Sequence, residues 1–145
     1  MSENSFYVPV GQGTEVSLIK WLQGAEIAVH EVMQQKFKAG VVVANVPFNS
    51  QLKRSIIAIN HPDRADTVRI YVKGAPEIVL ANCSYHYESA EYSQNLPNGE
   101  RYKPANKVQM GEEDKRRVLA EMEKMAKNSH RTIAFSYTDM TLKEF

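Results

Sequence analysis

Two lysines and a phenylalanine lie where a flat, phosphate-bearing ligand could bind. Lys73 closes an apolar run and precedes Gly74, whose missing Cβ would let such a ligand approach the backbone closely. In the alternative, Lys73 ends a strand in water and Gly74 forms the turn before a helix. Phe48 lies in a polar segment, where its ring could stack on a purine or instead fill the core. Lys53 follows shortly after and could approach phosphates or be a surface charge.

Two more residues have the chemistry for the same ligand. Glu15 lies at the start of an expected helix, where it either faces a ligand or favours the helix dipole. Arg131 lies between an expected helix and the next strand, where its forked donors could bind phosphate or finish the helix. Each residue alone leaves both roles open.

The motifs of a self-contained enzyme or a metal site are missing from the sequence. There is no Gly-x-x-x-x-Gly-Lys-Ser/Thr loop, no nucleophile elbow and no His-Glu-x-x-His helix. Cys83 is the only cysteine, and no set of Cys and His has metal-ligand spacing. We therefore assign no catalytic residue and no metal ligand.

Length and charge also limit the function. The 145 residues are enough for one domain with a single core. Eighteen basic and 17 acidic side chains leave almost no net charge, so we expect no nucleic-acid partner. No apolar run is long enough for a signal peptide at the N-terminus or for a membrane span later in the sequence. We expect a soluble, monomeric protein.

The elements that must position these residues follow from periodicity and breakers. Residues 14–22, 25–38, 76–83 and 112–127 have helical patterns or starts, and residues 41–46, 55–59, 67–72 and 132–137 have β-type patterns. Strands in succession, with helices early and late, predict an α+β domain with a mainly antiparallel twisted sheet.

The remaining segments are expected to be irregular. His61 falls in a turn-rich segment, 60–66, and is predicted to be a solvated loop residue. Residues 84–109 are predicted to form a polar, tyrosine-rich excursion with a tight hairpin at Pro97-Asn98-Gly99-Glu100. Residues 138–145 are predicted to form a loop that could begin another element.

Taken in order, the motifs resemble the nucleotide-binding (N) domain of type II P-type ATPases, the calcium and sodium/potassium pumps. The matching stretches are Gly11-Gln12-Gly13-Thr14-Glu15, Pro47-Phe48-Asn49-Ser50-x-x-Lys53, Lys73-Gly74-Ala75-Pro76-Glu77 and Arg131-Thr132-Ile133-Ala134-Phe135-Ser136-Tyr137. The resemblance covers nearly the whole chain, 1–145, as a single ATP-binding domain excised from a larger membrane pump. Lys-Gly-Ala-Pro-Glu is its most specific motif.

The resemblance implies a role for each candidate. Phe48 would stack on adenine, Glu15 would face the purine edge, and Lys53 would lie near the phosphates. Lys73 and Gly74 would line the base of the cleft, and Arg131 would help hold the phosphate chain. The neighbouring Arg54 is a second basic residue that could face the phosphates in place of Lys53.

In such pumps the domain binds Mg-ATP and positions it for phosphoryl transfer to an aspartate in a separate domain. That aspartate motif, Asp-Lys-Thr-Gly-Thr, is absent from this sequence, so we expect ATP binding without turnover. The implied partners are the phosphorylation and actuator domains of the pump, and the implied place is the cytoplasmic part of an integral membrane protein.

Residues 73–80 and 131–139 look most like plasma-membrane calcium pumps. A sodium/potassium pump is the alternative. Two other functions stay open at this stage. One is a non-catalytic interaction domain that uses the tyrosine-rich segment 85–102 and the 60–66 loop. The other is an independent hydrolase with an unrecognised site.

Overall fold

The computed structural model describes residues 9–36, 41–87 and 106–145. The chain divides into two compact units, Met1–Val43 and Ala44–Phe145, which are taken here one at a time. None of the described helices is long and apolar enough to cross a membrane.

The first unit contains a pair of helices, as the sequence predicts. They are α1 (Gly13–Gly24) and α2 (Val29–Lys36). The second starts later than the predicted residue 25, because the chain turns there first: Glu26 is left-handed (φ 58°), and the N–H of Ile27 donates to the Leu22 carbonyl at 3.0 Å. This reversal closes the end of α1 with backbone hydrogen bonds and delays the next helix.

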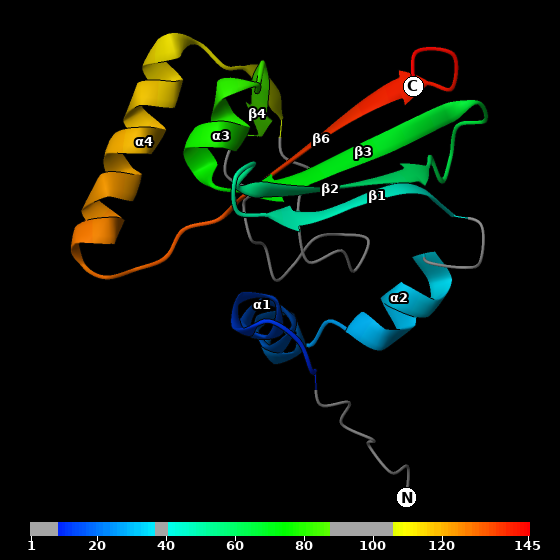
Figure 1. Ribbon diagram of the computed structural model, residues 1–145, viewed down its shortest axis with the longest axis horizontal. Helices are drawn as coiled ribbons and strands as arrows, with labels where there is room; N and C mark the ends of the chain where they lie inside the picture. The colour runs from blue at the N-terminus through cyan, green and yellow to red at the C-terminus, as the bar shows by residue number, and fades with distance from the viewer. Residues whose placement is uncertain (1–8, 37–40, 88–105) are drawn as a thin grey trace, which may run out of the picture. The chain divides into compact units, whose positions relative to one another are not determined.

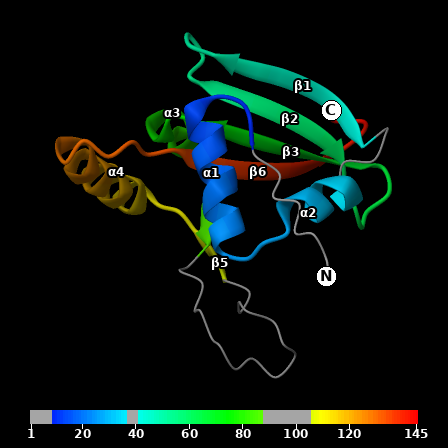
Figure 2. The same cartoon turned by 90° about the horizontal axis from the view of Figure 1, so that it is seen from below.

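The second unit is built on a four-stranded sheet. Its strands lie side by side in the order β1 (Val42–Asn49), β2 (Arg54–Asn60), β3 (Thr67–Gly74) and β6 (Ala134–Thr141), as Figure 2 shows. The pairs β2/β3 and β3/β6 are antiparallel. In Figure 1 the strand directions rotate from β1 to β6, which is the twist expected of such a sheet. The predicted α+β fold is confirmed.

Register divides the side chains of β3 between two faces. Arg69, Tyr71 and Lys73 alternate with Val68, Ile70 and Val72, and successive side chains of a strand point to opposite faces. The first three pair with Asp139, Tyr137 and Phe135 of β6. We call the face formed by these six residues the aromatic face. On the opposite face Val68 is fully buried, near Ala58 of β2, and both belong to the core.

The strand β6 continues beyond its predicted end at residue 137. Residues 138–141 pair with residues 67–70 of β3, so the predicted loop over 138–145 is wrong for its first half. Thr138 and Thr141 have the side-chain type favoured in strands. The strand β6 extends to residue 141 because β3 provides a pairing partner along its full length.

Two helices accompany the sheet in this unit, α3 (Pro76–Ala81) and α4 (Glu112–Lys127). The first packs against β3, β6 and α4 (Figure 1) and buries Val79. The bounds of α4 are those predicted. Its first turn is acidic and its last turn basic, which favours the helix dipole at both ends.

Two short strands were not predicted, β4 (Tyr85–Tyr87) and β5 (Lys107–Gln109). They pair antiparallel, so the start and end of the predicted excursion lie side by side. The predicted hairpin turn at Pro97-Asn98-Gly99 falls outside the described residues.

Candidate functional site

The two lysine motifs meet at one corner of the sheet. The N–H of Ala75 donates to the Lys53 carbonyl at 2.9 Å, and Gly74 is the register partner of Arg54. Phe48 belongs to the strand that leads into the Lys53 turn. Four of the predicted site residues, Phe48, Lys53, Lys73 and Gly74, are therefore carried by three consecutive strands and their connection.

The turn between β1 and β2, residues 49–53, is held by the side chain of Asn49. Its Oδ1 accepts the N–H of Gln51 at 2.7 Å and the N–H of Leu52 at 3.3 Å. The Lys53 N–H donates to the Asn49 carbonyl at 2.7 Å, and Lys53 has a left-handed φ of 50°. An asparagine that bonds the backbone ahead of it is a common way to fix a tight turn.

Lys53, and not Arg54, presents its charge to solvent. The Lys53 side chain is 58% exposed, and its Nζ lies 3.7 Å from Oε1 of Glu77 in α3. Arg54 is half-buried, and its Nε is buried without a hydrogen-bond partner among the described residues. The two basic residues thus differ in their access to a soluble anion.

The missing Cβ of Gly74 makes room for the protein's own backbone. A Cβ there would lie 2.5 Å from the Lys53 carbonyl oxygen and 2.7 Å from the Cβ of Arg54. Gly74 also points to the face opposite Lys73, because the two are adjacent in one strand. Close approach to a ligand is therefore not needed to explain this glycine.

Phe48 is not a core residue, since it is 55% exposed on β1. This removes the core-filling alternative for its ring. Lys73 is half-buried at the end of β3. It pairs with Phe135 of β6, whose ring is exposed like that of Phe48. Phe135 was not singled out by the sequence, because its alternating strand pattern leaves open which face is covered.

Glu15 and Arg131 lie apart from this corner in the chain. Glu15 is exposed in the first turn of α1, in the first unit. Arg131 is exposed in the segment between α4 and β6. The end of α4 is closed without it: Ser129 is left-handed (φ 61°), and the His130 N–H donates to the Met125 carbonyl at 3.0 Å. Arg131 is thus not required to finish the helix, and its phosphate role, like that of Glu15, remains a prediction.

The prediction that His61 is a solvated loop residue is wrong. Its side chain is 6% exposed, and its Nε2 lies 3.0 Å from Nη2 of Arg69 and 3.8 Å from Oδ2 of Asp139. Arg64 from the same loop also reaches Asp139. The loop between β2 and β3 therefore folds back onto the aromatic face, which no local pattern could indicate.

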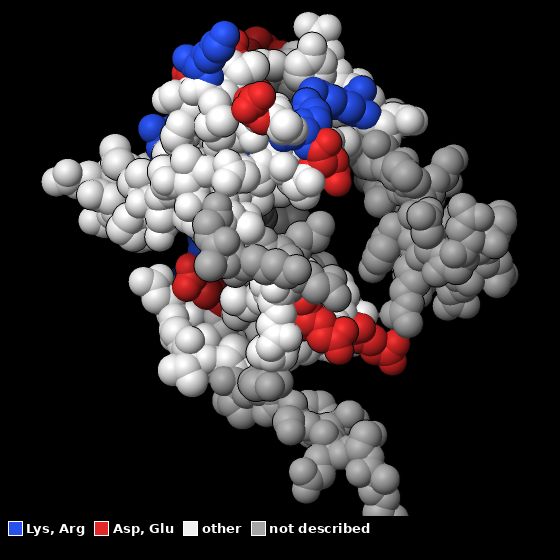
Figure 3. All heavy atoms as spheres, turned by 90° about the vertical axis from the view of Figure 1, so that its right-hand side faces the viewer, with Lys and Arg blue, Asp and Glu red and all other residues white. Residues whose placement is uncertain are grey.

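A charged pair joins β3 to β6 within this network. Arg69 donates to both carboxylate oxygens of Asp139, Nε to Oδ1 at 2.7 Å and Nη2 to Oδ2 at 2.9 Å. This geometry is the bidentate one that makes such pairs strong. The hydrogen bond from Arg69 lowers the pKa of Asp139 to about 2, and the same bond raises the pKa of Arg69. In Figure 3 the basic side chains in the upper part of the surface lie next to acidic ones.

Tyrosines extend the network along the same face. The guanidinium of Arg69 lies 4.6 Å from the ring centre of Tyr137, which packs against Tyr71 and stacks with Tyr87 of β4. A hydrogen bond to the Tyr87 hydroxyl raises the pKa of Tyr137. The charged pair of this network lies toward the end of β3 away from Lys73, because Asp139 pairs with Arg69 and Phe135 pairs with Lys73.

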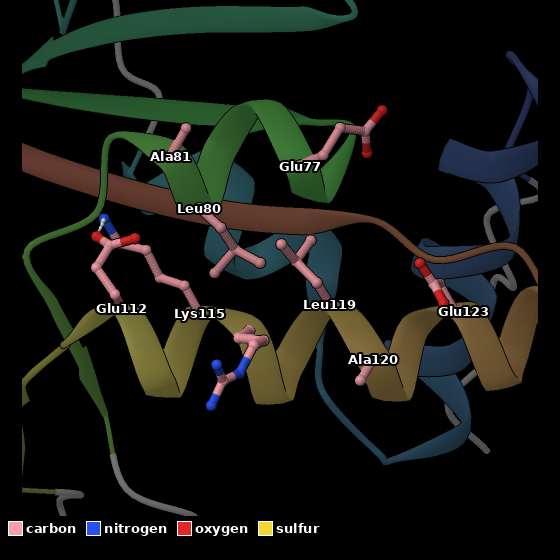
Figure 4. A pocket seen from close by; sticks show the side chains of 9 residues that line it. Glu77, Leu80, Ala81, Glu112, Lys115, Leu119, Ala120 and Glu123 are labelled. Carbon is pink, nitrogen blue, oxygen red and sulfur yellow. Dashed lines mark hydrogen bonds and ion pairs between the residues drawn. The ribbon is translucent and has the colours of Figure 1, made fainter.

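A separate cavity of about 520 Å³ lies between α3 and α4. Figure 4 shows Leu80 and Leu119 pointing toward each other across it, with the ion pair of Glu112 and Lys115 at one end. None of the six predicted site residues lines it. Within the described part of the chain, no group of three His, Cys, Asp or Glu side chains could hold a metal ion.

Comparison with known proteins agrees with the motif pattern. Residues 2–145 match the family model of the P-type ATPase cytoplasmic domain N. The chain is 30% identical over 77 residues (53% of the chain) to calcium-transporting ATPase 2 of Cryptococcus neoformans. It is 44% identical over 45 residues (31%) to the plasma membrane-type calcium-transporting ATPase 10 of Arabidopsis thaliana.

A sodium/potassium pump is also similar: the human sodium/potassium-transporting ATPase subunit alpha-4 is 33% identical over 86 residues, 59% of the chain. The matched regions span 5%, 4% and 8% of these three relatives' own lengths. The family model, in contrast, matches almost every residue of the chain. The chain therefore belongs to the P-type ATPase cytoplasmic domain N family.

Proposed function

We propose that this domain binds ATP, as Mg-ATP, at the corner of the sheet where the turn that follows Phe48 and carries Lys53 meets the Lys73 end of β3. The observation that carries the proposal is the junction of the two motifs, in which the Lys53 carbonyl accepts the Ala75 N–H while the Lys53 ammonium stays exposed. A largely exposed ring at Phe48 offers a stacking surface for adenine. Together they provide one platform for the base and one cation for the phosphates.

Each predicted residue has a defined part in this proposal. Phe48 stacks on adenine, and Lys73 lines the base of the cleft next to Gly74, which keeps β2 and β3 close. Lys53 and Arg131 offset the charge of the triphosphate, which arrives with magnesium. Glu15 contacts the purine edge. The greater exposure of Lys53 supports it over Arg54 as the phosphate contact.

The affinity expected of such a site is low. A few contacts in an open site correspond to a Kd on the order of 0.1 to 1 mM, or roughly −4 to −5.5 kcal/mol. The domain alone should bind nucleotide without hydrolysing it, because its sequence lacks the aspartate motif that accepts the phosphoryl group.

We assign the domain to the cytoplasmic part of a P-type cation pump, where it would position ATP for an aspartate of the phosphorylation domain and would have the phosphorylation and actuator domains as its partners. The names of two of the relatives support calcium as the transported ion. The name of the third relative supports the alternative, a sodium/potassium pump. The family match itself supports the domain assignment, which both pump types share.

Substituting the platform and the cleft lysine tests the proposal. We expect Phe48→Ala and Lys73→Ala each to weaken ATP binding by about 3- to 10-fold in calorimetric titrations, since each removes a contact worth about 1 kcal/mol. The circular dichroism spectra and unfolding midpoints should stay close to those of the wild type.

Two matched controls separate site effects from general ones. Phe145→Ala removes an exposed ring that follows the last residue of β6. That residue, Thr141, pairs with Thr67, which lies at the other end of β3 from Lys73. Lys124→Ala removes an exposed lysine on α4. Both should bind ATP like the wild type. Unchanged affinity in both Phe48→Ala and Lys73→Ala would move the site elsewhere.

A further inference from the structure

We propose that Asn49 is a positioning residue that sets the affinity of the domain for the phosphate chain of its nucleotide and not for the base. The inference rests on the proposed function, because it concerns the same site. Asn49 has no expected contact with ATP. Its part is to hold the turn from which Lys53 reaches the phosphates.

The first step of the argument is the side chain of Asn49 itself. Its single carbonyl oxygen accepts two backbone N–H groups, from Gln51 at 2.7 Å and Leu52 at 3.3 Å. Both donors lie inside the turn that connects β1 to β2 and would otherwise have to bond water. The amide of Asn49 therefore replaces solvent as the internal partner of this turn.

The second step is the conformation of Lys53. Its φ of 50° is left-handed, a region that residues with a Cβ seldom occupy without support from their surroundings. Support comes from both sides. The Lys53 N–H donates to the Asn49 carbonyl at 2.7 Å, and the Lys53 carbonyl accepts from Ala75 at 2.9 Å. The backbone of Lys53 is thus clamped between the Asn49 turn and the start of α3.

The third step is what this clamping does for the charge. The Lys53 side chain is more than half exposed, and its Nζ lies 3.7 Å from Oε1 of Glu77, which is itself about half exposed. Such a pair is weak in water, so a triphosphate can replace the Glu77 carboxylate. A fixed backbone leaves only the side-chain torsions of Lys53 to be ordered on binding, which favours the phosphate contact.

It follows that loosening the turn should weaken the binding of the phosphate chain and leave the affinity for the base unchanged. Phe48 lies on β1, before the turn, and is held in the strand by its own pairing. A ligand without phosphates, adenosine, does not use Lys53. ATP and adenosine therefore separate a change in the turn from a change in the base platform.

The experiment compares Asn49→Ala, Asn49→Ser, Lys53→Ala and the double variant Asn49→Ala/Lys53→Ala, each titrated with ATP and with adenosine. Loss of the Lys53 charge should weaken ATP binding about 10-fold, since a charged contact is worth at least one decade of affinity. We expect Asn49→Ala to weaken it about 5-fold and Asn49→Ser to lie between Asn49→Ala and the wild type, because serine caps such turns more weakly. The double variant should bind ATP no more weakly than Lys53→Ala, and adenosine affinity should stay within about 2-fold throughout.

Lys53→Gly guards against an effect of unfolding. Glycine tolerates the left-handed conformation, so this variant keeps the turn while removing the cation. It should unfold at or above the wild-type midpoint and still bind ATP as weakly as Lys53→Ala. If Asn49→Ala does not fold, Asn49→Ser provides the comparison.

The possible failures are distinct. If the wild type binds neither ATP nor adenosine, the proposed function is wrong. If the wild type prefers ATP but Asn49→Ala and Asn49→Ser bind it equally well, the role of Asn49 is wrong. Equal losses for ATP and adenosine in Asn49→Ala would make Asn49 a merely structural residue and would also overturn the inference.

Discussion

At the residue scale, the backbone conformation of Lys53 accounts for the glycine at position 74. Lys53 is left-handed and sends its carbonyl toward β3, and Gly74 is the position in β3 where that carbonyl arrives. The sequence predicts a glycine that permits close approach, and the structure shows that the approaching group is backbone. Gly74 therefore allows the close packing of the Lys53 turn against β3.

We predict that Gly74→Ala destabilises the domain by roughly 2 to 4 kcal/mol, as expected for overpacking against backbone. The new Cβ would lie 2.5 Å from the Lys53 carbonyl oxygen, far inside van der Waals contact. Urea unfolding followed by circular dichroism measures the change. Gly111→Ala is the control: its Cβ would meet only Asp114 Oδ2 at 3.7 Å, so it should cost about 1 kcal/mol or less. Equal losses in the two variants would show that the close contact is not the cause.

At the element scale, the antiparallel pair β3/β6 carries the candidate site residue Lys73 at one end and a charged network at the other. One end presents Lys73 and Phe135, and the other end holds Arg69 and Asp139. The bidentate contact between Arg69 and Asp139 crosses from one strand to the other and also anchors the loop that contains His61. This pairing keeps the strand that bears Lys73 in register.

The Asp139 contact predicts a specific dependence of stability on pH. Its carboxyl has a pKa of about 2 in the folded chain against an ordinary 3.8. A folded pKa below the unfolded one adds stability that is fully present above about pH 5 and is lost as the pH falls toward 2. The amount is on the order of 1 to 2 kcal/mol. Urea unfolding at a series of pH values should show this loss in the wild type and much less of it in Asp139→Asn.

Glu123→Gln, an exposed carboxylate of α4, serves as the comparison for that series. It should retain the wild-type loss of stability in acid. A wild-type and an Asp139→Asn profile that run parallel from pH 5 to about pH 2 would remove Asp139 from the acid response.

The elements also show what could be predicted from sequence and what could not. The bounds of α4 and the positions of β2 and β3 follow from periodicity, because each has a complete amphipathic or β-branched pattern of its own. The extension of β6 to Thr141 depends on its partner β3, and β4 forms only because β5 lies beside it. The burial of His61 depends on Asp139, distant in the chain. Contacts of this kind leave no trace in a local pattern.

The six candidate site residues show the same division. Phe48, Lys53, Lys73 and Gly74 could be grouped from their motifs, and the structure brings the two motifs together at Lys53. The support that Asn49 gives to Lys53 could not be predicted, because it requires the left-handed conformation at Lys53. The parts assigned to Glu15 and Arg131 stay predictions.

At the scale of the whole molecule, the chain is a member of the P-type ATPase cytoplasmic domain N family. The family model spans residues 2–145, across both compact units. The matched relatives are far longer, and their matched regions are small parts of them. Ion choice and transport therefore belong to the proposal for the parent pump, whereas nucleotide binding can be tested on this chain as it stands.

Titration of the ¹⁵N-labelled chain with Mg-ATP, followed by amide chemical shifts, tests that claim most directly. We predict saturable shifts for the amides of residues 48–53 and 73–75, with a Kd on the order of 0.1 to 1 mM. Amides of Leu119 and Glu123, beside the cavity between α3 and α4, should not move. Amides near Phe48 and Lys73 that stay still at several millimolar Mg-ATP, or shifts confined to the α3 and α4 cavity, would contradict the account.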